Sequence, residues 1–352
     1  MKILADASLP GLNEAFPKPF KLSQYHSNDE LIRLLDNQDI LLCRANTKIN
    51  RDLIKQNTSL KYIATASSGS DHLESNYLES LNIQILDAKG CNATAVADYV
   101  VSTIAYLEQH HLMPGKKAGV IGLGHVGSIV FKRLQAAGFD VLCYDPLKAN
   151  EESTFNSCKK EELMSCNLLC IHAELHSNPP HPSVNLIDES FLAELKPGTV
   201  LINASRGGVV AENALLNTPT PLIYCTDVFL NEPEVNPDVI NKATLCTPHI
   251  AGHSIEAKYK AVSLISEQIH QLAQLPVPQI TFPSMPNQLP LNDNKTWQEH
   301  LLSIYDPSKE TLELKKGIDK KSCFLSLRKK HTVRHDFSQY FTLMPNKLKG
   351  LI

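Results

Sequence analysis

The chain has 352 residues, of which 43% are apolar and 20% charged, and its formal net charge at pH 7 is −3. This length is enough for two domains and a smaller third, each with its own core. The weakly acidic balance gives no reason to expect nucleic acid or an anionic membrane as a partner, and no apolar run is long enough to span a bilayer.

Nine cysteines are scattered along the chain without the spacing of metal ligands. Several lie inside apolar runs, where cysteine serves as a small buried residue. The N-terminal run MKILADASLP lacks the basic flank and cleavage site of a secretory signal. An odd number of cysteines without such a signal favours a reducing compartment. We therefore expect a cytoplasmic protein without a bound metal.

The first part of the chain, residues 1–93, alternates short apolar runs with helical segments. This alternation predicts a parallel sheet with helices on both faces, in which ligands gather at the carboxyl ends of the strands. Two loops after these strands carry polar groups, RANTK at 44–48 and SSGSDH at 67–72. Arg44 and Lys48 are candidate charges for an anion, and the serine loop offers N–H and hydroxyl donors. A solvated face and a plain turn are the alternatives.

After a predicted connecting helix at residues 92–112, the stretch 118–145 (AGVIGLGHVGSIVFKRLQAAGFDVLCYD) predicts a strand, a glycine turn, a helix and a second strand that ends in an acid. The first glycine permits the turn, the second lets the backbone approach a pyrophosphate, and the third lets the helix pack closely on the strand. The helix N-terminus then faces the phosphates. The final acid suits the ribose hydroxyls of NAD and would repel the 2'-phosphate of NADP. NAD is therefore the expected cofactor, with contacts from Gly122, Gly124, His125, Val126, Gly127 and Asp145.

Three later strand ends carry polar side chains, NASRGG at 203–208, DVFLNEP at 227–233 and TPHIAGH at 247–253. They follow strands of one predicted sheet, so we expect them to converge at its ligand edge. Imidazole titrates near neutral pH, so His249 suits the base that takes a hydroxyl proton. Glu232 would fix the tautomer of the ring, and Arg206 can bind a carboxylate through two parallel hydrogen bonds. Each residue alone is more often structural. Together, beyond a nucleotide motif, they favour hydride transfer at an alcohol that bears a carboxylate.

A helix over residues 254–274 is expected to return to the first part of the chain. Five prolines between residues 275 and 290 mark a linker. We therefore expect a discontinuous substrate domain (1–93 with 254–280), an NAD-binding domain (94–253) and a C-terminal domain (286–352). The last has too few apolar residues to bury a large core alone, which favours packing on a partner subunit.

The combination of GLGHVG, LINASRGGVV, DVFLNEPE and TPHIAGHS resembles the D-2-hydroxyacid dehydrogenase family over residues 1 to about 275. TASSGSDH, AKGCNATAVADYV and the tail IYDPSKETLELKKG are similar to the branch of that family that oxidises 4-phospho-D-erythronate for vitamin B6 synthesis. The resemblance implies a flavodoxin-like substrate domain and a Rossmann NAD domain, both doubly wound parallel sheets. It also implies a small C-terminal α+β domain that joins two chains in a homodimer.

The resemblance implies roles for individual residues as well. Catalysis would fall to Arg206, Glu232 and His249. Further cofactor contacts would be Ala173, Asp227 and Gly252, and substrate contacts would be Ala45, Ser67, Ser68, Gly69 and His253. The chain departs from the family pattern at three places: His253 replaces a tyrosine, Ala45 replaces a serine, and Ala173-Glu174 replaces Thr-Pro in a cofactor-side turn.

Two other functions stay open at this point. The substrate of the same reaction could be phosphoglycerate or another 2-hydroxy acid, although the tail favours phosphoerythronate. The fold also serves as an NADH-sensing regulator without turnover, which the presence of the arginine, glutamate and histidine disfavours.

Overall fold

The computed structural model describes residues 1–56, 58–283, 294–331, 334–341 and 346–352. The chain divides into two compact units. One comprises Met1–Asn92 with Ser254–Met285, and the other Ala93–His253 with Pro286–Ile352. Part of the predicted proline linker, residues 284–290, lies outside the described residues.

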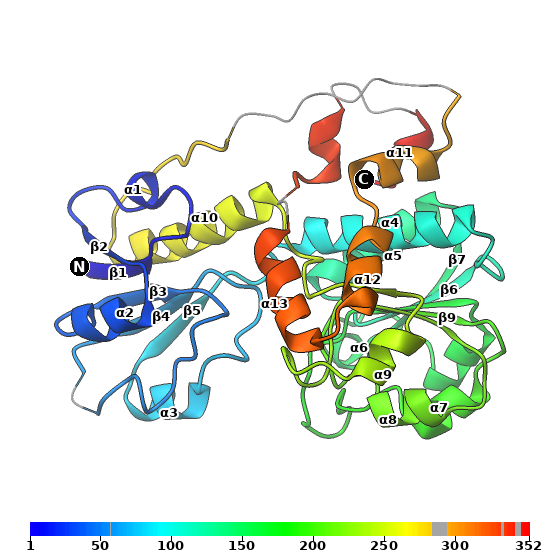
Figure 1. Cartoon of the computed structure of the whole chain (residues 1–352). Coiled ribbons are helices and arrows are strands. Elements are labelled where there is room, and N and C mark those ends of the chain that lie inside the picture. Colours follow the sequence, from blue (N-terminus) through cyan, green and yellow to red (C-terminus); the bar gives the residue numbers. More distant parts are fainter. Residues whose placement is uncertain (57, 284–293, 332–333, 342–345) are drawn as a thin grey trace. The chain divides into compact units, whose positions relative to one another are not determined.

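The first unit contains a five-stranded parallel sheet in the order β2-β1-β3-β4-β5. Its strands are β1 (Lys2–Asp6), β2 (Lys21–Tyr25), β3 (Ile40–Cys43), β4 (Tyr62–Thr65) and β5 (Gln84–Asp87). Both faces are covered, as a parallel sheet requires. Helices α1 (Leu12–Ala15) and α10 (Ile255–Leu272) pack on one face, and α2 (Asn28–Leu34) and α3 (Ser75–Ser80) on the other (Figure 1).

Helix α10 makes the first unit discontinuous in sequence. Ser254 caps it by accepting a hydrogen bond from the Ala257 N–H at 3.0 Å. Its buried side chains then recur at helical spacing and join the core beneath β1 and β3, with Val262, Ile265 and Ile269 fully enclosed. Burial of each such side chain stabilises the unit by about 1.5–3 kcal/mol, so tertiary packing holds the helix here.

The second unit contains a six-stranded parallel sheet in the order β11-β10-β9-β8-β6-β7. Its strands are β6 (Lys117–Ile121), β7 (Asp140–Tyr144), β8 (Leu168–Ile171), β9 (Val200–Asn203), β10 (Ile223–Thr226) and β11 (Leu245–Cys246). The chain runs from β6 outward to β7 and then crosses to β8 on the other side. That reversal creates the switch point at which doubly wound sheets bind ligands, and the predicted fold class is confirmed.

Helices cover both faces of the second sheet (Figure 1). On one face lie α4 (Ala93–Gln109), which is the predicted connecting helix, and α5 (His125–Ala136). On the other face lie α7 (Glu189–Glu194), α8 (Glu212–Asn217) and α9 (Pro237–Lys242). Two short segments follow β7, α6 (Pro146–Glu151) and a 3₁₀ helix (Lys160–Ser165). Among the described residues, no helix is both long and apolar enough to cross a membrane.

The C-terminal segment belongs to the second unit, and the domain boundary that we expected before it stays a prediction. Its described residues form α11 (Trp297–Ile304), α12 (Ser308–Lys316), α13 (Lys320–Lys330) and two short 3₁₀ turns (Phe337–Tyr340 and Asn346–Leu348). Leu301 and Phe337 belong to the core that contains α4 and α5. Leu314 and Phe324 belong to the core that contains α7 and α9. The described part of the segment belongs to the second unit because its apolar side chains are buried in these two cores.

This shared core predicts a cooperative loss of stability. Leu314 on α12 is fully buried, so Leu314→Ala is expected to lower the free energy of unfolding by about 2–5 kcal/mol. Leu312→Ala is the matched control, since this side chain on the same helix is 54% exposed and its truncation should change stability by no more than about 0.5 kcal/mol. Urea unfolding monitored by circular dichroism measures both. A main transition that Leu314→Ala leaves unchanged would show that the segment folds separately.

Candidate active site

The glycine turn between β6 and α5 has the geometry of a phosphate-binding turn. Gly122 has a φ of 88°, and a Cβ atom there would lie 2.6 Å from the backbone nitrogen of Ala173. A Cβ on Gly127 would lie 1.8 Å from the Gly122 carbonyl oxygen, so only glycine permits this close packing. Gly124 caps α5 without a side-chain hydrogen bond, and a Cβ there would meet nothing within 4 Å. The space beside Gly124 is open, and the first turn of a helix offers free N–H groups to which a pyrophosphate can bind.

Asp145 is tied to the glycine turn at the end of β7. Its Oδ2 accepts a hydrogen bond from the Leu123 N–H at 2.8 Å, and its Oδ1 accepts one from the Lys148 N–H at 3.0 Å. Each carboxylate oxygen keeps a lone pair for a ribose hydroxyl. The Lys148 ammonium binds the Leu123 carbonyl at 3.2 Å and lies 3.7 Å from Glu152. These contacts suit the adenosine ribose of NAD.

The other predicted cofactor residues of this half lie around the same turn. His125 is the exposed first residue of α5, and Val126 is partly buried against the core of the unit. The backbone of Ala173 abuts Gly122, so the turn after β8 forms a wall of the glycine turn. The preceding His172 is buried without a hydrogen-bond partner for its ring, and burial lowers its pKa to about 3, so its imidazole is neutral.

The loops after β10 and β11 join an acid to an imidazole. His249 Nδ1 lies 2.6 Å from Glu232 Oε2, while Glu232 Oε1 accepts a hydrogen bond from the Phe229 N–H at 2.9 Å. Burial raises the pKa of Glu232, but the charge and hydrogen bond of His249, the Phe229 N–H and the charge of Arg328 outweigh it and hold the pKa below its usual value. Glu232 is therefore an ionised carboxylate that orients the imidazole, which leaves Nε2 to exchange a proton.

Asp227 holds the His249 loop in place. Its carboxylate accepts hydrogen bonds from the Thr247 hydroxyl at 2.7 Å and from the N–H groups of Ile250 and Ala251, each at 2.8 Å. Burial raises the pKa of Asp227. His249 has a φ of 55°, a left-handed conformation that costs a non-glycine residue about 1–3 kcal/mol. The hydrogen bonds to Asp227 offset that strain. The contact of Asp227 with NAD stays a prediction.

The Arg206 turn packs against the Glu232 loop. Asn203 shapes this turn, because its Oδ1 accepts a bond from the Ser205 N–H at 3.1 Å and its Nδ2 donates to the Arg206 carbonyl at 3.1 Å. A Cβ on Gly207 would lie 1.9 Å from the Phe229 carbonyl oxygen, so the turns touch backbone to backbone. Arg206 Nη1 donates to the Ser205 carbonyl at 2.9 Å. The structure thus brings together the three strand ends that carry the predicted catalytic residues.

The residues after His249 meet the C-terminal segment within the same unit. The Ala251 carbonyl accepts a hydrogen bond from Arg334 at 3.1 Å, which fixes the turn that contains Gly252. The His253 ring centroid lies 6.0 Å from that of His331. His253 therefore packs beside the tail at the place where the family pattern has a tyrosine.

The remaining predicted substrate residues lie in the first unit. The Ser67 hydroxyl accepts a hydrogen bond from the Ala45 N–H at 3.0 Å, and the Ser68 hydroxyl accepts one from the Gly90 N–H at 3.3 Å. Gly69 follows them in a partly exposed loop. The two loops that the sequence singles out in this half are therefore joined at the carboxyl edge of the sheet.

A depression of about 250 Å³ in the first unit contains one of the two candidate cations, Arg44. Arg44 Nε donates a hydrogen bond to Asp6 Oδ2 at 2.8 Å within this depression. Lys48 is exposed and does not line this depression. Of the two candidate cations, Arg44 therefore lies in the depression and Lys48 lies on the exposed surface.

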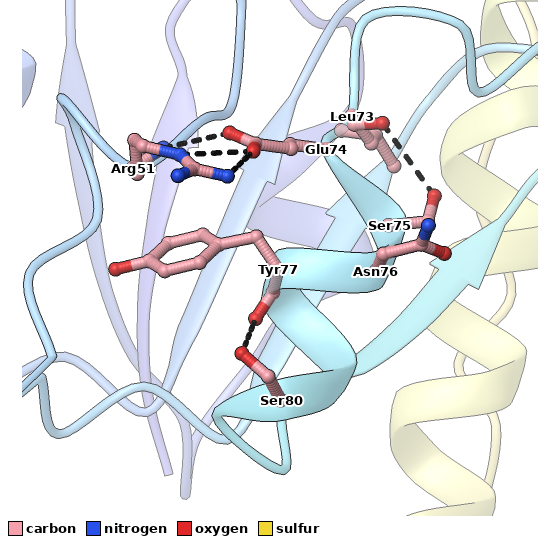
Figure 2. A pocket seen from close by; sticks show the side chains of 7 residues that line it. All are labelled: Arg51, Leu73, Glu74, Ser75, Asn76, Tyr77 and Ser80. Carbon is pink, nitrogen blue, oxygen red and sulfur yellow. Dashed lines mark hydrogen bonds and ion pairs between the residues drawn. The ribbon is translucent and has the colours of Figure 1, made fainter.

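A larger hollow lies beside α3 and contains no predicted site residue. Figure 2 shows Arg51 reaching across to Glu74 above the ring of Tyr77. Arg51 Nε donates to Glu74 at 3.0 Å, and the guanidinium carbon lies 5.4 Å from the Tyr77 ring centroid. This cation is neutralised by its neighbours, so the hollow adds no charged site to the first unit. Among the described residues, no three His, Cys, Asp or Glu side chains are grouped to hold a metal ion.

Comparison with known proteins agrees with this geometry. Residues 98–251 match the NAD-binding domain of D-isomer specific 2-hydroxyacid dehydrogenases. The erythronate-4-phosphate dehydrogenase of Legionella pneumophila (strain Lens) is 55% identical over 341 residues, which cover 97% of each chain. That of Coxiella burnetii (strain RSA 493 / Nine Mile phase I) is 35% identical over 96% of this chain and 94% of the relative. The chain belongs to the erythronate-4-phosphate dehydrogenase family.

Solved structures support the fold at this level. The NAD-bound 3-phosphoglycerate dehydrogenase of Entamoeba histolytica has a TM-score of 0.66 at 22% identity and covers 80% of this chain and 99% of its own. The NAD-dependent formate dehydrogenase of Staphylococcus aureus has a TM-score of 0.64 at 22% identity and covers 81% and 100%. The predicted family, an NAD-dependent dehydrogenase with a Rossmann domain, is confirmed.

Sequence reasoning missed two cations near the predicted site residues of this family member. Arg328 on α13 lies 3.8 Å from Glu232. Lys258 on α10 has its pKa lowered by burial and then by the charge of Arg44. The basic run LRKKH indicates only a solvated segment, and the spacing of Lys258 indicates only a helix. Neither pattern indicates that Arg328 lies near Glu232 or that Lys258 lies near Arg44.

The Asp145 geometry predicts a change in cofactor preference. Asp145→Asn keeps an acceptor for a backbone N–H but removes the charge, so discrimination against NADPH should fall about tenfold, within the range for hydrogen bonds to charged groups. Fluorescence titration with NADH and NADPH measures the ratio of the two dissociation constants. Glu151→Gln on the exposed end of α6 is the control. An unchanged ratio in Asp145→Asn would contradict the assignment of this acid to the ribose.

Proposed function

We propose that the protein oxidises 4-phospho-D-erythronate at C2 with NAD and forms (R)-3-hydroxy-2-oxo-4-phosphooxybutanoate for the synthesis of pyridoxal 5'-phosphate. The observation that carries this proposal is the similarity to erythronate-4-phosphate dehydrogenases along nearly the whole chain, tail included. The hydrogen-bonded pair of Glu232 and His249 supports the chemistry.

In this proposal three side chains have different roles in the reaction. The glycine turn would hold NAD, whose nicotinamide would supply the hydride acceptor for C2. His249 takes the proton of the C2 hydroxyl, and Glu232 stabilises the imidazolium that results. Arg206 holds the substrate carboxylate and the negative charge that develops on the reacting oxygen.

The first unit contains the remaining predicted substrate contacts, apart from His253. Because the Ser67 hydroxyl already accepts the Ala45 N–H, its own O–H remains to donate to the carboxylate or a hydroxyl of the substrate. Ser68, Gly69 and Ala45 itself would line the same place, and His253 would take the position of the family tyrosine. With a net charge of −3, the chain must meet the substrate phosphate with locally placed cations, Arg44 or Lys48.

A direct assay decides between this function and its alternatives. We expect NADH formation with 4-phosphoerythronate and little with 3-phosphoglycerate, measured by NADH fluorescence under matched conditions. Preference for 3-phosphoglycerate would move the protein to another branch of the D-2-hydroxyacid dehydrogenases. Intact NADH binding without turnover of either acid would indicate a regulator.

The proton-transfer role predicts the effect of His249→Asn. Loss of a general acid-base group typically lowers the rate by about 10²–10⁴-fold, and NADH affinity should stay unchanged because the glycine turn is untouched. In the native protein, oxidation needs the neutral imidazole and should speed up as pH rises, whereas reduction needs the imidazolium and should slow down. Steady-state rates in both directions from pH 5.5 to 9 test this. A variant that keeps the native pH profile would contradict the role.

The phosphate assignment predicts a change in KM. Replacing both candidate cations, Arg44→Met with Lys48→Met, should raise the KM for 4-phosphoerythronate at least about tenfold, since a charged hydrogen bond contributes about 1.5–3 kcal/mol. Lys61→Met is the control, because Lys61 pairs with Asp39 at the opposite end of the sheet. An unchanged KM in the double variant would show that other groups bind the phosphate.

We also propose a cytoplasmic homodimer. The charge and cysteine usage support the location. Exposed apolar side chains on the C-terminal segment, Ile318 and Leu325, support a partner surface there. Light scattering of the native chain and of Ile318→Glu with Leu325→Glu would report the mass, and a monomeric native chain would disprove the dimer.

A further inference from the structure

Helix α13 contacts the loop that carries the catalytic acid at three points. The Phe324 ring, which is buried, packs edge-on against Phe229 with the ring centroids 6.1 Å apart. Lys321 Nζ lies 2.5 Å from Glu234 Oε1, and Arg328 Nη1 lies 3.8 Å from Glu232 Oε2. A helix from the C-terminal segment thus supports the loop after β10 within the same unit.

The contact of Arg328 with Glu232 is electrostatic. A separation of 3.8 Å is too long for a hydrogen bond but short enough for an ion pair. The Arg328 side chain is 35% exposed and that of Glu232 is 18% exposed, so solvent screens the pair in part. His249 Nδ1 binds the same oxygen, Oε2, at 2.6 Å. One carboxylate oxygen therefore faces both the imidazole and the guanidinium.

The charged groups on the elements packed around this pair include two carboxylates, the cation Lys321 and, on the turn that touches the Glu232 loop, Arg206. Glu212 binds the Leu230 N–H at 2.8 Å, and its pKa is raised by burial and then by the charge of Glu232. Asp227 lies on the other side of His249 and binds the backbone of its loop. Lys321 is matched by Glu234 on the rim of the loop. Against the two neighbouring carboxylates, Arg328 supplies a permanent positive charge at Glu232.

We propose that Arg328 is a positioning residue, which holds the Glu232 carboxylate toward His249 and lowers the pH at which His249 gains its proton. The proposal rests on the proposed function for its rate measurements. The guanidinium fixes the carboxylate and also weakens its hold on the imidazolium, because both cations share Oε2. Removal of the guanidinium therefore lets the imidazolium persist to higher pH. The C-terminal segment would act on catalysis through this contact.

Neutral substitutions test this charge. Arg328→Met keeps the aliphatic stem, Arg328→Gln is a second neutral variant, Arg328→Lys restores the charge, and Lys321→Met removes a cation from the same helix without a contact to Glu232. For oxidation of 4-phosphoerythronate, both neutral variants should shift the midpoint of the kcat/KM profile upward by about half a pH unit. Their kcat/KM at neutral pH should fall about two- to fivefold. Arg328→Lys should recover most of the shift, and Lys321→Met should match the native protein.

A second measurement does not depend on turnover. The proton titration of the His249 ring, followed by NMR of the C2–H in the NADH complex, should show the same upward shift in Arg328→Met and Arg328→Gln. NADH affinity close to the native value shows that a variant is folded. A native midpoint in both neutral variants, or an equal shift in Lys321→Met, would overturn the proposal. If the native protein fails to oxidise 4-phosphoerythronate, the proposed function fails, and the NMR titration still decides the role of Arg328.

Discussion

The loops after β10 and β11 in the second unit depend on one buried carboxylate. Asp227 accepts three hydrogen bonds from residues 247–251, and these bonds hold His249 in a left-handed conformation that its own backbone disfavours. Without that restraint the imidazole would lose its fixed direction toward Glu232. The two acids have separate tasks, since Asp227 shapes the backbone and Glu232 orients the ring. Their environments differ accordingly, because burial raises the pKa of Asp227 whereas nearby charges and hydrogen bonds lower that of Glu232.

Glycine residues allow the close backbone packing of the glycine turn and of the Arg206 turn. A side chain on Gly122 would collide with the backbone of Ala173 after β8, and one on Gly127 would collide with the Gly122 carbonyl. A side chain on Gly207 would collide with the Phe229 carbonyl, where the Arg206 turn meets the Glu232 loop. Backbone packing therefore sets the distances in the second unit, and the reactive side chains are placed on a rigid frame. This is how a sheet edge built from short loops can position groups for hydride transfer.

Much of this arrangement could be predicted from the sequence because its signals are local. The alternation of strands and helices, the glycine spacing and the acid at Asp145 each report their own surroundings, and strand ends in one parallel sheet must share an edge. The pairing of Glu232 with His249 followed from that topology. Arg328 and the buried side chains of the tail could not be predicted, because a basic run and a few apolar residues look the same whether they face water, a partner or the core of their own chain.

The placement of Leu314 and Phe324 in the core of the second unit has a consequence for biosynthesis. These residues are translated after both sheets. When the strands of the second sheet have been synthesised, the hydrophobic core of that unit is therefore still incomplete. The core of the second unit can close only after these residues have emerged. A product that ends before Leu314 would leave exposed the apolar surface that the two side chains cover.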